Sequence, residues 1–294
     1  MANGLFSEKH PLEFALTALI VCLGVYSATS YLVESTPLAA AAVAAAVALA
    51  FFAASRTTFW PPNASIADRA DARKIAIAAI VSGIAVSLLG IFLGAWEPQP
   101  TDIPLLPMTI EGPSPLLVSL ISLIALCVLT GIYEEALFSA VLFGGLRRYY
   151  GEANAAEKNG LSPTLASRLT SRAAAVQGIL FAVAHVAGGL IAFAQTFSLV
   201  VALQVVVWFA GTFLFGIVTA VLMETGRSLV LNAAVHAVYD FALFSPLALQ
   251  AGTIRPTTVT GDAIDLALFT VQAVVLAAAF FALYFSGKRT KRAE

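Results

Sequence analysis

Long apolar segments recur along the whole chain, and they constrain its fold more than any other feature. A helix that crosses a bilayer needs about 20 consecutive, mostly apolar residues. Eight segments meet this need, at roughly residues 12–33, 38–54, 75–95, 115–146, 173–194, 197–222, 228–247 and 263–286. The composition agrees, because 60% of the residues are hydrophobic and only 11% are charged, whereas soluble domains carry about 25% charged residues. We predict an all-α, polytopic integral membrane helix bundle that forms a single transmembrane domain over residues 1–294.

Two of these segments depart from the usual length of a span. The segment at 115–146 is too long for one straight crossing, so we expect it to tilt or to extend past the membrane surface. The segment at 38–54 is short and rich in alanine. The first segment is a full span without a small-residue cleavage site, and we therefore expect no cleavable signal peptide.

The distribution of lysine and arginine predicts how the bundle is oriented. If the N-terminus lies inside and the chain alternates through eight spans, 15 of the 16 basic residues fall on the cytoplasmic side and only Arg255 falls outside. The inside residues are Lys9, Arg56, Arg69, Arg73, Lys74, Arg147, Arg148, Lys158, Arg168, Arg172, Arg227, Lys288, Arg289, Lys291 and Arg292. Cytoplasmic loops of membrane proteins carry such an excess. We expect both termini in the cytoplasm and a multi-pass protein of the plasma membrane.

Five acidic or histidine residues lie inside the predicted spans away from the span ends, where each costs on the order of several kcal/mol. They are Glu134 and Glu135 in the fourth span, His185 in the fifth, and His236 and Asp240 in the seventh. With a rise of about 1.5 Å per residue, Glu134 and His185 lie about 18–20 Å from the cytoplasmic ends of their helices. His236 lies about 12 Å from the same side. Three helices thus bring acids and imidazoles to about the same depth.

The seventh span places its polar residues on one face. Asn232, His236 and Asp240 follow one another at i, i+4 and i+8, so they line one side of a helix. Phe181 and His185 share a face of the fifth span in the same way. We therefore expect these acids and imidazoles to come together where the polar faces of the helices meet.

A layer of this composition supports several kinds of chemistry. A carboxylate beside an imidazole acts as a general base on water, and a second imidazole stabilises an oxyanion. Histidine and glutamate also bind zinc, although the HExxH signature is absent. The same residue types line proton or ion pathways in carriers, and buried polar groups also hydrogen-bond helices together. Convergence from three helices favours a functional site over hydrogen bonding alone.

Short motifs lie on the three spans that carry these residues. They read Glu134-Glu135-Ala-Leu-Phe138, then Phe181-Ala-Val-Ala-His185, then His236-Ala-Val-Tyr-Asp240. In this order, they resemble the EExxxR, FxxxH and HxxxN or HxxxD motifs of the CAAX protease and bacteriocin-processing family, the Abi-type membrane proteins. The resemblance covers about residues 115–245.

The resemblance implies an intramembrane endopeptidase that uses glutamate and histidine, without a metal ion or other cofactor. Glu134 would activate the hydrolytic water, with His185 assisting and orienting it. His236 and Asp240 would form the oxyanion site. Phe181 would pack beside the site and take no part in the chemistry.

The sequence departs from the family motifs at two positions. Glu135 would be a supporting acid that holds the helices together, but the arginine expected four residues later is Ser139. A serine cannot neutralise a buried carboxylate, so we expect Glu135 to be neutral at pH 7. At the second position, Asp240 lacks the amide donor of asparagine. It would donate a hydrogen bond only when protonated, or it would instead orient His236.

Three functions remain open at this point. The first is a CAAX/Abi-type endopeptidase that hydrolyses a peptide bond near the cytoplasmic side of the membrane. The second, motivated by Ser139, is a catalytically altered member that acts as an immunity or protein-binding factor. The third is a carrier or metal-binding membrane protein. For the first we expect a peptide or protein substrate, with or without an attached lipid, together with membrane lipids and no nucleic acid.

Overall fold

The fold is known from a computed structural model, which describes residues 6–32, 37–60, 69–95, 103–104, 115–152, 164–254 and 259–290. Within these residues, eight helices are long and apolar enough to cross a membrane. They are α2 (Pro11–Leu32), α3 (Pro37–Phe59), α4 (Arg69–Leu93), the continuous helix α5–η1–α6 (Pro115–Glu134, Glu135–Leu142 and Phe143–Tyr149), α9 (Arg172–Thr196), α10 (Leu199–Gly226), α11 (Leu229–Ala251) and α12 (Ala263–Thr290). The predicted all-α membrane bundle is confirmed.

The remaining described elements are short. Helix α1 (Phe6–Lys9) precedes α2, and α8 (Leu165–Leu169) precedes α9. Strands β1 (Ile103–Pro104) and β2 (Thr253–Ile254) pair antiparallel, with Ile103 opposite Ile254. This pairing joins the segment between α4 and α5 to the end of α11.

The helices extend beyond the apolar segments that predict them. Helix α3 continues to Phe59, five residues past the predicted segment, and α4 begins at Arg69, six residues before its segment. The added turns are polar, and long basic side chains on such turns reach the membrane surface while their stems stay apolar. Hydropathy therefore locates each crossing but underestimates the length of its helix. Lys158, Arg255, Lys291 and Arg292, used above for orientation, lie outside the described residues.

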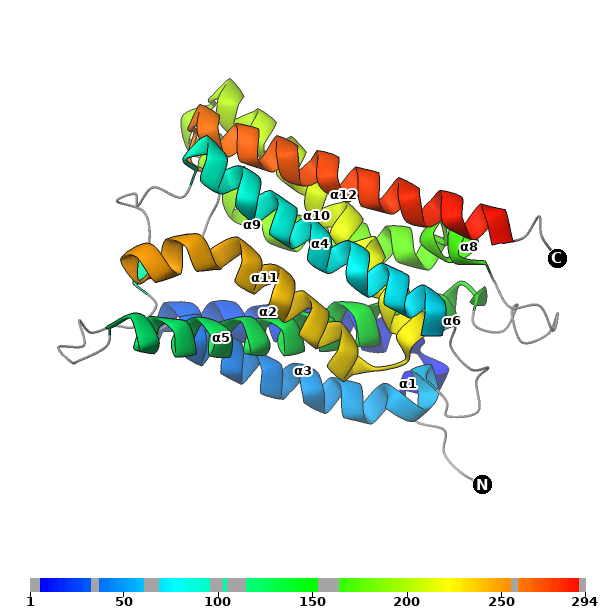
Figure 1. Cartoon of the computed structure of the whole chain (residues 1–294). Coiled ribbons are helices and arrows are strands. Elements are labelled where there is room, and N and C mark those ends of the chain that lie inside the picture. Colours follow the sequence, from blue (N-terminus) through cyan, green and yellow to red (C-terminus); the bar gives the residue numbers. More distant parts are fainter. Residues whose placement is uncertain are drawn as a thin grey trace.

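Two groups of helices build the bundle, with α4 and α11 between them (Figure 1). Helices α9, α10 and α12 form one group, since α10 packs against both α9 and α12. Helices α2, α3 and α5 form the other, since α3 packs against both α2 and α5. Helix α11 packs against α5 and α4, and α4 packs against α12, which connects the groups. The C-terminal end of α12 lies at the same end of the bundle as α1 (Figure 1).

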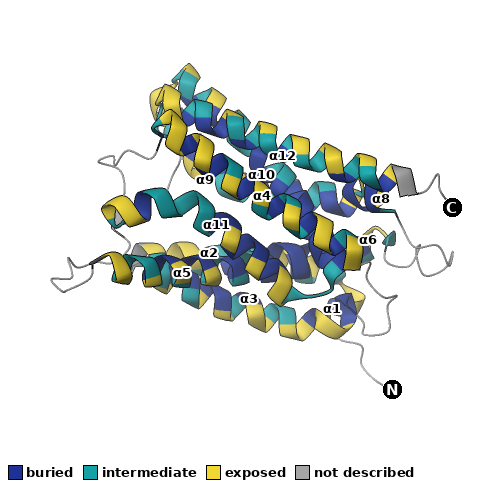
Figure 2. Ribbon diagram, viewed as in Figure 1, coloured by how far each residue is buried: buried dark blue, intermediate teal, exposed yellow. Residues whose placement is uncertain are grey.

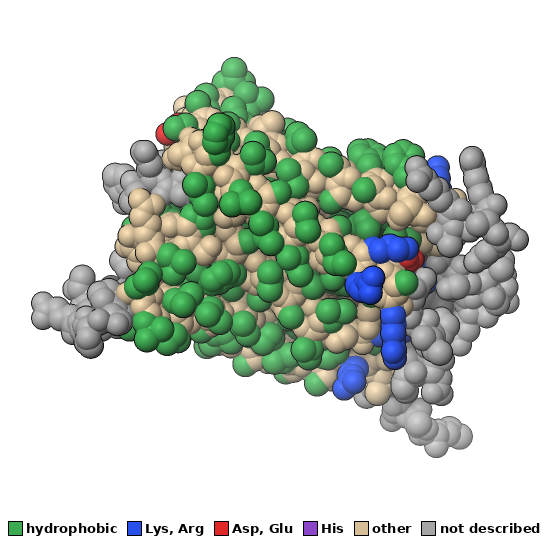
Figure 3. All heavy atoms as spheres, viewed as in Figure 1, with side chains coloured by type: hydrophobic (Ala, Val, Ile, Leu, Met, Phe, Trp, Pro, Cys, Tyr) green, Lys and Arg blue, Asp and Glu red, His purple; other side chains and the backbone are tan. Residues whose placement is uncertain are grey.

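The outer surface suits a hydrocarbon environment. Large apolar side chains are exposed along the outer helices, as at Leu88 and Phe92 of α4 and Phe281 of α12. Buried residues face the middle of the bundle (Figure 2). On the face seen in Figure 3, hydrophobic side chains cover the central band and lysine and arginine gather at one end, where α4 begins. We call this end of the bundle the basic end. It is the end that the charge pattern assigns to the cytoplasm.

Two-residue turns connect α9, α10 and α11. Phe197 and Arg227 adopt the left-handed conformation, each with φ of 50°, and a serine in extended conformation follows each of them. The Ser228 hydroxyl accepts a hydrogen bond from the backbone N–H of Leu231, which satisfies one free donor at the start of α11. Because both turns are so short, α9 and α11 run in the same direction, with α10 antiparallel to both.

A buried ion-pair cluster joins the helices at the basic end. Arg147 Nη2 lies 2.9 Å from Glu224 Oε1, and Arg168 Nε lies 3.8 Å from the same oxygen. Arg227 Nε donates to the Glu224 carbonyl oxygen at 3.1 Å. The Arg147 and Arg227 guanidinium groups lie 5.6 and 5.5 Å from the centre of the Trp60 ring. Burial, and then the nearby Arg147, lowers the pKa of Arg227. The cluster therefore ties α6, α8 and α10 to the end of α3.

Replacement of Glu224 with Gln is expected to destabilise the fold. The change removes the carboxylate that Arg147 contacts while the guanidinium stays buried, and breaking such a pair costs about 3 kcal/mol. Thermal unfolding in detergent measures the loss. The control is Asp71→Asn, because the pair of Asp71 with Lys74 has a half-exposed lysine and such pairs contribute less than about 1 kcal/mol. Equal unfolding temperatures for the two variants would contradict a stabilising role of the Glu224 cluster.

Candidate active site

The helix that carries the two glutamates changes its geometry at the site. It is α-helical up to Glu134 and becomes a π-helix from Glu135 to Leu142. π-Helical turns are rare and occur frequently at functional sites. Trp60 Nε1 donates a hydrogen bond of 2.9 Å to the carbonyl oxygen of Ala140, inside this π segment. The wider turn begins between the two glutamates, and both of their side chains lie against His236.

A glycine lets this helix approach α11 closely. A Cβ atom at Gly131 would lie 2.6 Å from the carbonyl oxygen of Ala233 and 3.2 Å from the backbone nitrogen of Ala237. Only a residue without a Cβ fits so near a neighbouring backbone. Gly131 precedes Glu134 by three residues, and Ala233 and Ala237 flank His236. The close approach therefore places Glu134 beside His236.

Glu134 lies between the two imidazole rings. Its Oε2 atom is 3.4 Å from His185 Nε2 and 3.6 Å from His236 Nε2. Asp240 Oδ2 is also 3.6 Å from His236 Nε2. The Glu134 Oε2 atom is buried and makes no hydrogen bond with any residue that the structure describes. Both Nε2 atoms are thus within ion-pair distance of the same carboxylate oxygen.

Glu135 binds the far side of the His236 ring. Its Oε1 atom lies 2.6 Å from His236 Nδ1, and its Oε2 atom accepts a hydrogen bond from Asn232 Nδ2. Glu135 was expected to be neutral because Ser139 offers no basic partner. His236 is such a partner, from another helix and within salt-bridge distance. This corrects the expectation, which rested on the absence of an arginine at position 139. Ser139 instead donates a hydrogen bond of 3.2 Å to the Thr219 hydroxyl.

The second imidazole is oriented by its own helix and by aromatic rings. His185 Nδ1 lies 2.8 Å from the carbonyl oxygen of Phe181, which leaves Nε2 directed at Glu134. The Phe181 ring packs against His185 with 4.2 Å between ring centres and meets Phe138 edge to face. Trp208 of α10 meets His185 edge to face from another direction. Both imidazoles therefore have Nδ1 engaged and Nε2 turned toward the same carboxylate.

The five residues differ in how far they are exposed. The Glu135 and His236 side chains are 1% and 4% exposed, whereas those of Glu134 and His185 are 14% and 25% exposed. Every residue from Glu135 to Arg147 is buried. The accessible surface of the cluster thus belongs to Glu134, His185 and the 12%-exposed Asp240, and a substrate would meet these residues first.

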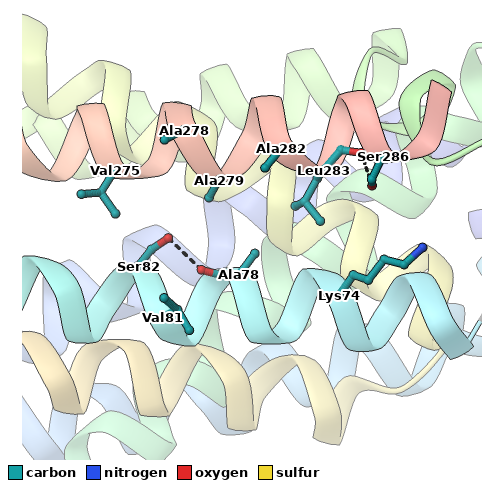
Figure 4. Close-up of a pocket in the computed structure, with 10 residues that line it drawn as sticks. All are labelled: Lys74, Ala78, Val81, Ser82, Val275, Ala278, Ala279, Ala282, Leu283 and Ser286. Atoms are coloured by element: carbon teal, nitrogen blue, oxygen red, sulfur yellow. Dashed lines mark hydrogen bonds between the residues drawn. The ribbon is translucent and has the colours of Figure 1, made fainter. Parts of the chain in front are cut away.

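A separate groove lies between α4 and α12 (Figure 4). It has a volume of about 460 Å³ and is lined mainly by alanine and other apolar side chains, with Lys74 at one end. None of the five cluster residues lines it. The groove therefore offers no acid or imidazole for hydrolysis.

The structure brings together all five residues that the sequence singled out. Within the described residues, no group of three or more His, Cys, Asp or Glu side chains is arranged to hold a metal ion. The sequence analysis missed Gly131, which stands three residues before Glu134. It placed Asn232 on the helix face of His236 but gave it no role. The i, i+4 spacing of Asn232 was visible in the sequence, but its partner Glu135 was not.

A known family model covers the part of the chain that carries this site. No curated protein matches the chain. One family model matches residues 116–242, described as type II CAAX prenyl endopeptidase Rce1-like. The matched region contains the π segment, α9, α10 and most of α11, and hence all five cluster residues. This match confirms the family suspected from the three motifs: residues 116–242 form an Rce1-like domain of the type II CAAX prenyl endopeptidases.

Proposed function

We propose that the protein is an intramembrane endopeptidase in which Glu134 activates the hydrolytic water. The observation that carries the proposal is the position of Glu134 Oε2, buried without a hydrogen bond between the Nε2 atoms of His185 and His236. A general base must lie within hydrogen-bond reach of the proton it removes, directly or through one water. A water that contacts Glu134 and His185 from their accessible side would satisfy that condition.

The proposed reaction runs as follows. The water transfers a proton to Glu134 and its oxygen attacks the carbonyl carbon of the scissile peptide bond. His236 carries protons on both ring nitrogens, with Nδ1–H bound to Glu135, and donates its Nε2–H to the oxyanion that forms. Glu135 stabilises this charged imidazole as a supporting acid. Protonated Glu134 then gives its proton to the leaving amine, and the C–N bond breaks.

The proposed substrate is a peptide or protein segment that reaches the bilayer, with or without an attached lipid. The family description names CAAX prenyl endopeptidases, and a polypeptide C-terminus near the membrane would suit this site. The cluster lies nearer the basic end on α11, since His236 is only seven residues from the start of that helix. We propose that this multi-pass protein lies in the plasma membrane and cleaves its substrate near the cytoplasmic side, because basic ends face the cytoplasm.

Hydrolysis by the purified protein tests the function directly. The protein is reconstituted into vesicles and given two matched peptides ending in a CAAX sequence, one farnesylated and one not. Cleavage of either peptide supports the proposal, and the ratio of the two rates measures the contribution of the lipid. Absence of cleavage with both peptides and with unrelated membrane-anchored peptides would favour the altered, protein-binding member of the family. Inactivation by a chelator, reversed by zinc, would favour a metal enzyme.

Replacing Asp240 with Asn is expected to change the pH dependence of hydrolysis. Asp240 faces His236 and, from the other helices, Glu134, Glu135 and His185. If Asp240 assists the oxyanion, it donates only when protonated, and activity declines at high pH as its carboxyl ionises. An asparagine amide donates at every pH. We expect Asp240→Asn to retain more of its maximal rate at pH 9 than the wild type does.

The control for this experiment is Asp71→Asn, which changes an acid at the basic end. Its profile should coincide with that of the wild type. A profile of Asp240→Asn with the wild-type decline at high pH would show that Asp240 does not donate. Asp240 would then be assigned to orienting His236.

A further inference from the structure

We infer that Asn232 is a positioning residue that holds the Glu135–His236 pair in its working geometry. The inference rests on the proposed function, because it assigns a task within the proposed site. Asn232 is fully buried on α11, one helical turn before His236. It belongs to none of the three motifs that identify the family.

The Asn232 amide makes two hydrogen bonds that fix its orientation. Its Nδ2 group donates one hydrogen to Glu135 Oε2 and the other, at 3.1 Å, to the backbone carbonyl of Thr219. A side-chain NH₂ group has two hydrogens, and both are used. The reversed amide would direct its oxygen at two acceptors, so the hydrogen-bond network selects the orientation.

The Thr219 carbonyl is a firm anchor for this amide. It belongs to α10, which contacts the π segment and α11. The Thr219 hydroxyl accepts from Ser139 and donates to the carbonyl of Gly216, each at 3.2 Å. Asn232 therefore links three elements through buried hydrogen bonds: α10 at Thr219, the π segment at Glu135, and its own helix α11.

The consequence reaches His236 through Glu135. With Oε2 held by Asn232, the Glu135 carboxylate presents Oε1 to His236 Nδ1 at 2.6 Å. A buried carboxylate that loses one of two donors is poorly satisfied and rotates to recover it. Rotation would release Nδ1, and His236 Nε2 would no longer be held toward Glu134 and Asp240. Asn232 thus provides, from α11, the second hydrogen bond that Glu135 receives. Ser139, on the same helix as Glu135, donates to Thr219 instead.

Nitrogen-15 NMR of the imidazole rings tests the inference without any measurement of activity. The chain has three histidines, so His10→Gln and His185→Gln variants assign the signals of labelled protein in detergent micelles. The variants to compare are Asn232→Leu, Asn232→Asp and Ser139→Ala. Ser139→Ala is the matched control, since it also removes a hydrogen bond at Thr219 but leaves the carbonyl that Asn232 uses.

In the wild type and in Ser139→Ala, we expect His236 Nδ1 to carry a hydrogen-bonded proton. In Asn232→Leu and Asn232→Asp we expect the His236 Nδ1 signal to shift toward that of an imidazole nitrogen whose proton is not hydrogen-bonded or exchanges with water. For hydrolysis we expect kcat to fall by about 10- to 100-fold, as for other residues that orient a functional imidazole, with KM within about twofold.

Unchanged His236 signals in folded Asn232→Leu or Asn232→Asp would overturn the inference. If Asn232→Leu fails to fold, the nearly isosteric Asn232→Asp decides, because it keeps the side-chain volume and replaces the amide with a carboxyl group, which cannot donate to both Glu135 and the Thr219 carbonyl. Shifted signals in a protein that hydrolyses no peptide would support the positioning role and reject the proposed function. Failure of the positioning role and failure of the proposed function therefore give different results.

Discussion

Replacement of Glu134 with Gln is expected to lower kcat/KM for peptide hydrolysis by about 10³-fold or more. Glutamine keeps the size of the side chain and one carbonyl oxygen, but an amide is not a base at neutral pH. Glu134 Oε2 makes no hydrogen bond with any described residue and lies 3.4 Å from His185 Nε2. Initial rates with the farnesylated and unmodified peptides, measured at equal amounts of folded protein, give the ratio.

The matched control for this substitution is Glu13→Gln. Glu13 lies in the first turn of α2 with its side chain 62% exposed, so the change there should leave the rate and the unfolding temperature unchanged. Activity of Glu134→Gln within tenfold of the wild type would remove Glu134 from the proposed role. The base would then have to be sought at Asp240 or His185, the other accessible members of the cluster.

Substitution of Gly131 by Ala is expected to damage both stability and activity. The added Cβ would lie 2.6 Å from the Ala233 carbonyl oxygen, and neither helix backbone can move without disturbing its neighbours. Overpacking of this kind costs about 1–3 kcal/mol. Separation of α5 from α11 also draws Glu134 away from His236, and a displacement of about 1 Å in a catalytic arrangement can cost about 10²-fold in rate. Thermal unfolding and kcat/KM measure the two effects.

Gly188→Ala is the matched control for this prediction. Gly188 lies inside helix α9, three residues after His185, and a Cβ there would meet nothing within 4 Å. Alanine favours helix over glycine by about 1 kcal/mol, so this variant should be as stable as the wild type or more so. A Gly131→Ala protein with wild-type stability and rate would show that the α5–α11 spacing is not critical for the site.

The eight spans and the polar layer followed from the sequence because a bilayer imposes them locally. Each crossing needs its own apolar residues and satisfies its backbone hydrogen bonds within one helix, so hydropathy located all eight. An ionisable residue in such a span is costly wherever its partners lie, which singled out Glu134, His185 and His236 before any contact was known.

The arrangement of the site required the tertiary structure, because its contacts join helices far apart in the chain. Asn232 and Glu135 are 97 residues apart, and His236 and Glu135 are 101 apart. The sequence alone left Glu135 without a partner, since only Ser139 was near it on the same helix. The π segment and the close approach at Gly131 likewise depend on packing against α3 and α11. Local composition therefore determined which residues enter the membrane, and helix packing decided which of them bind one another.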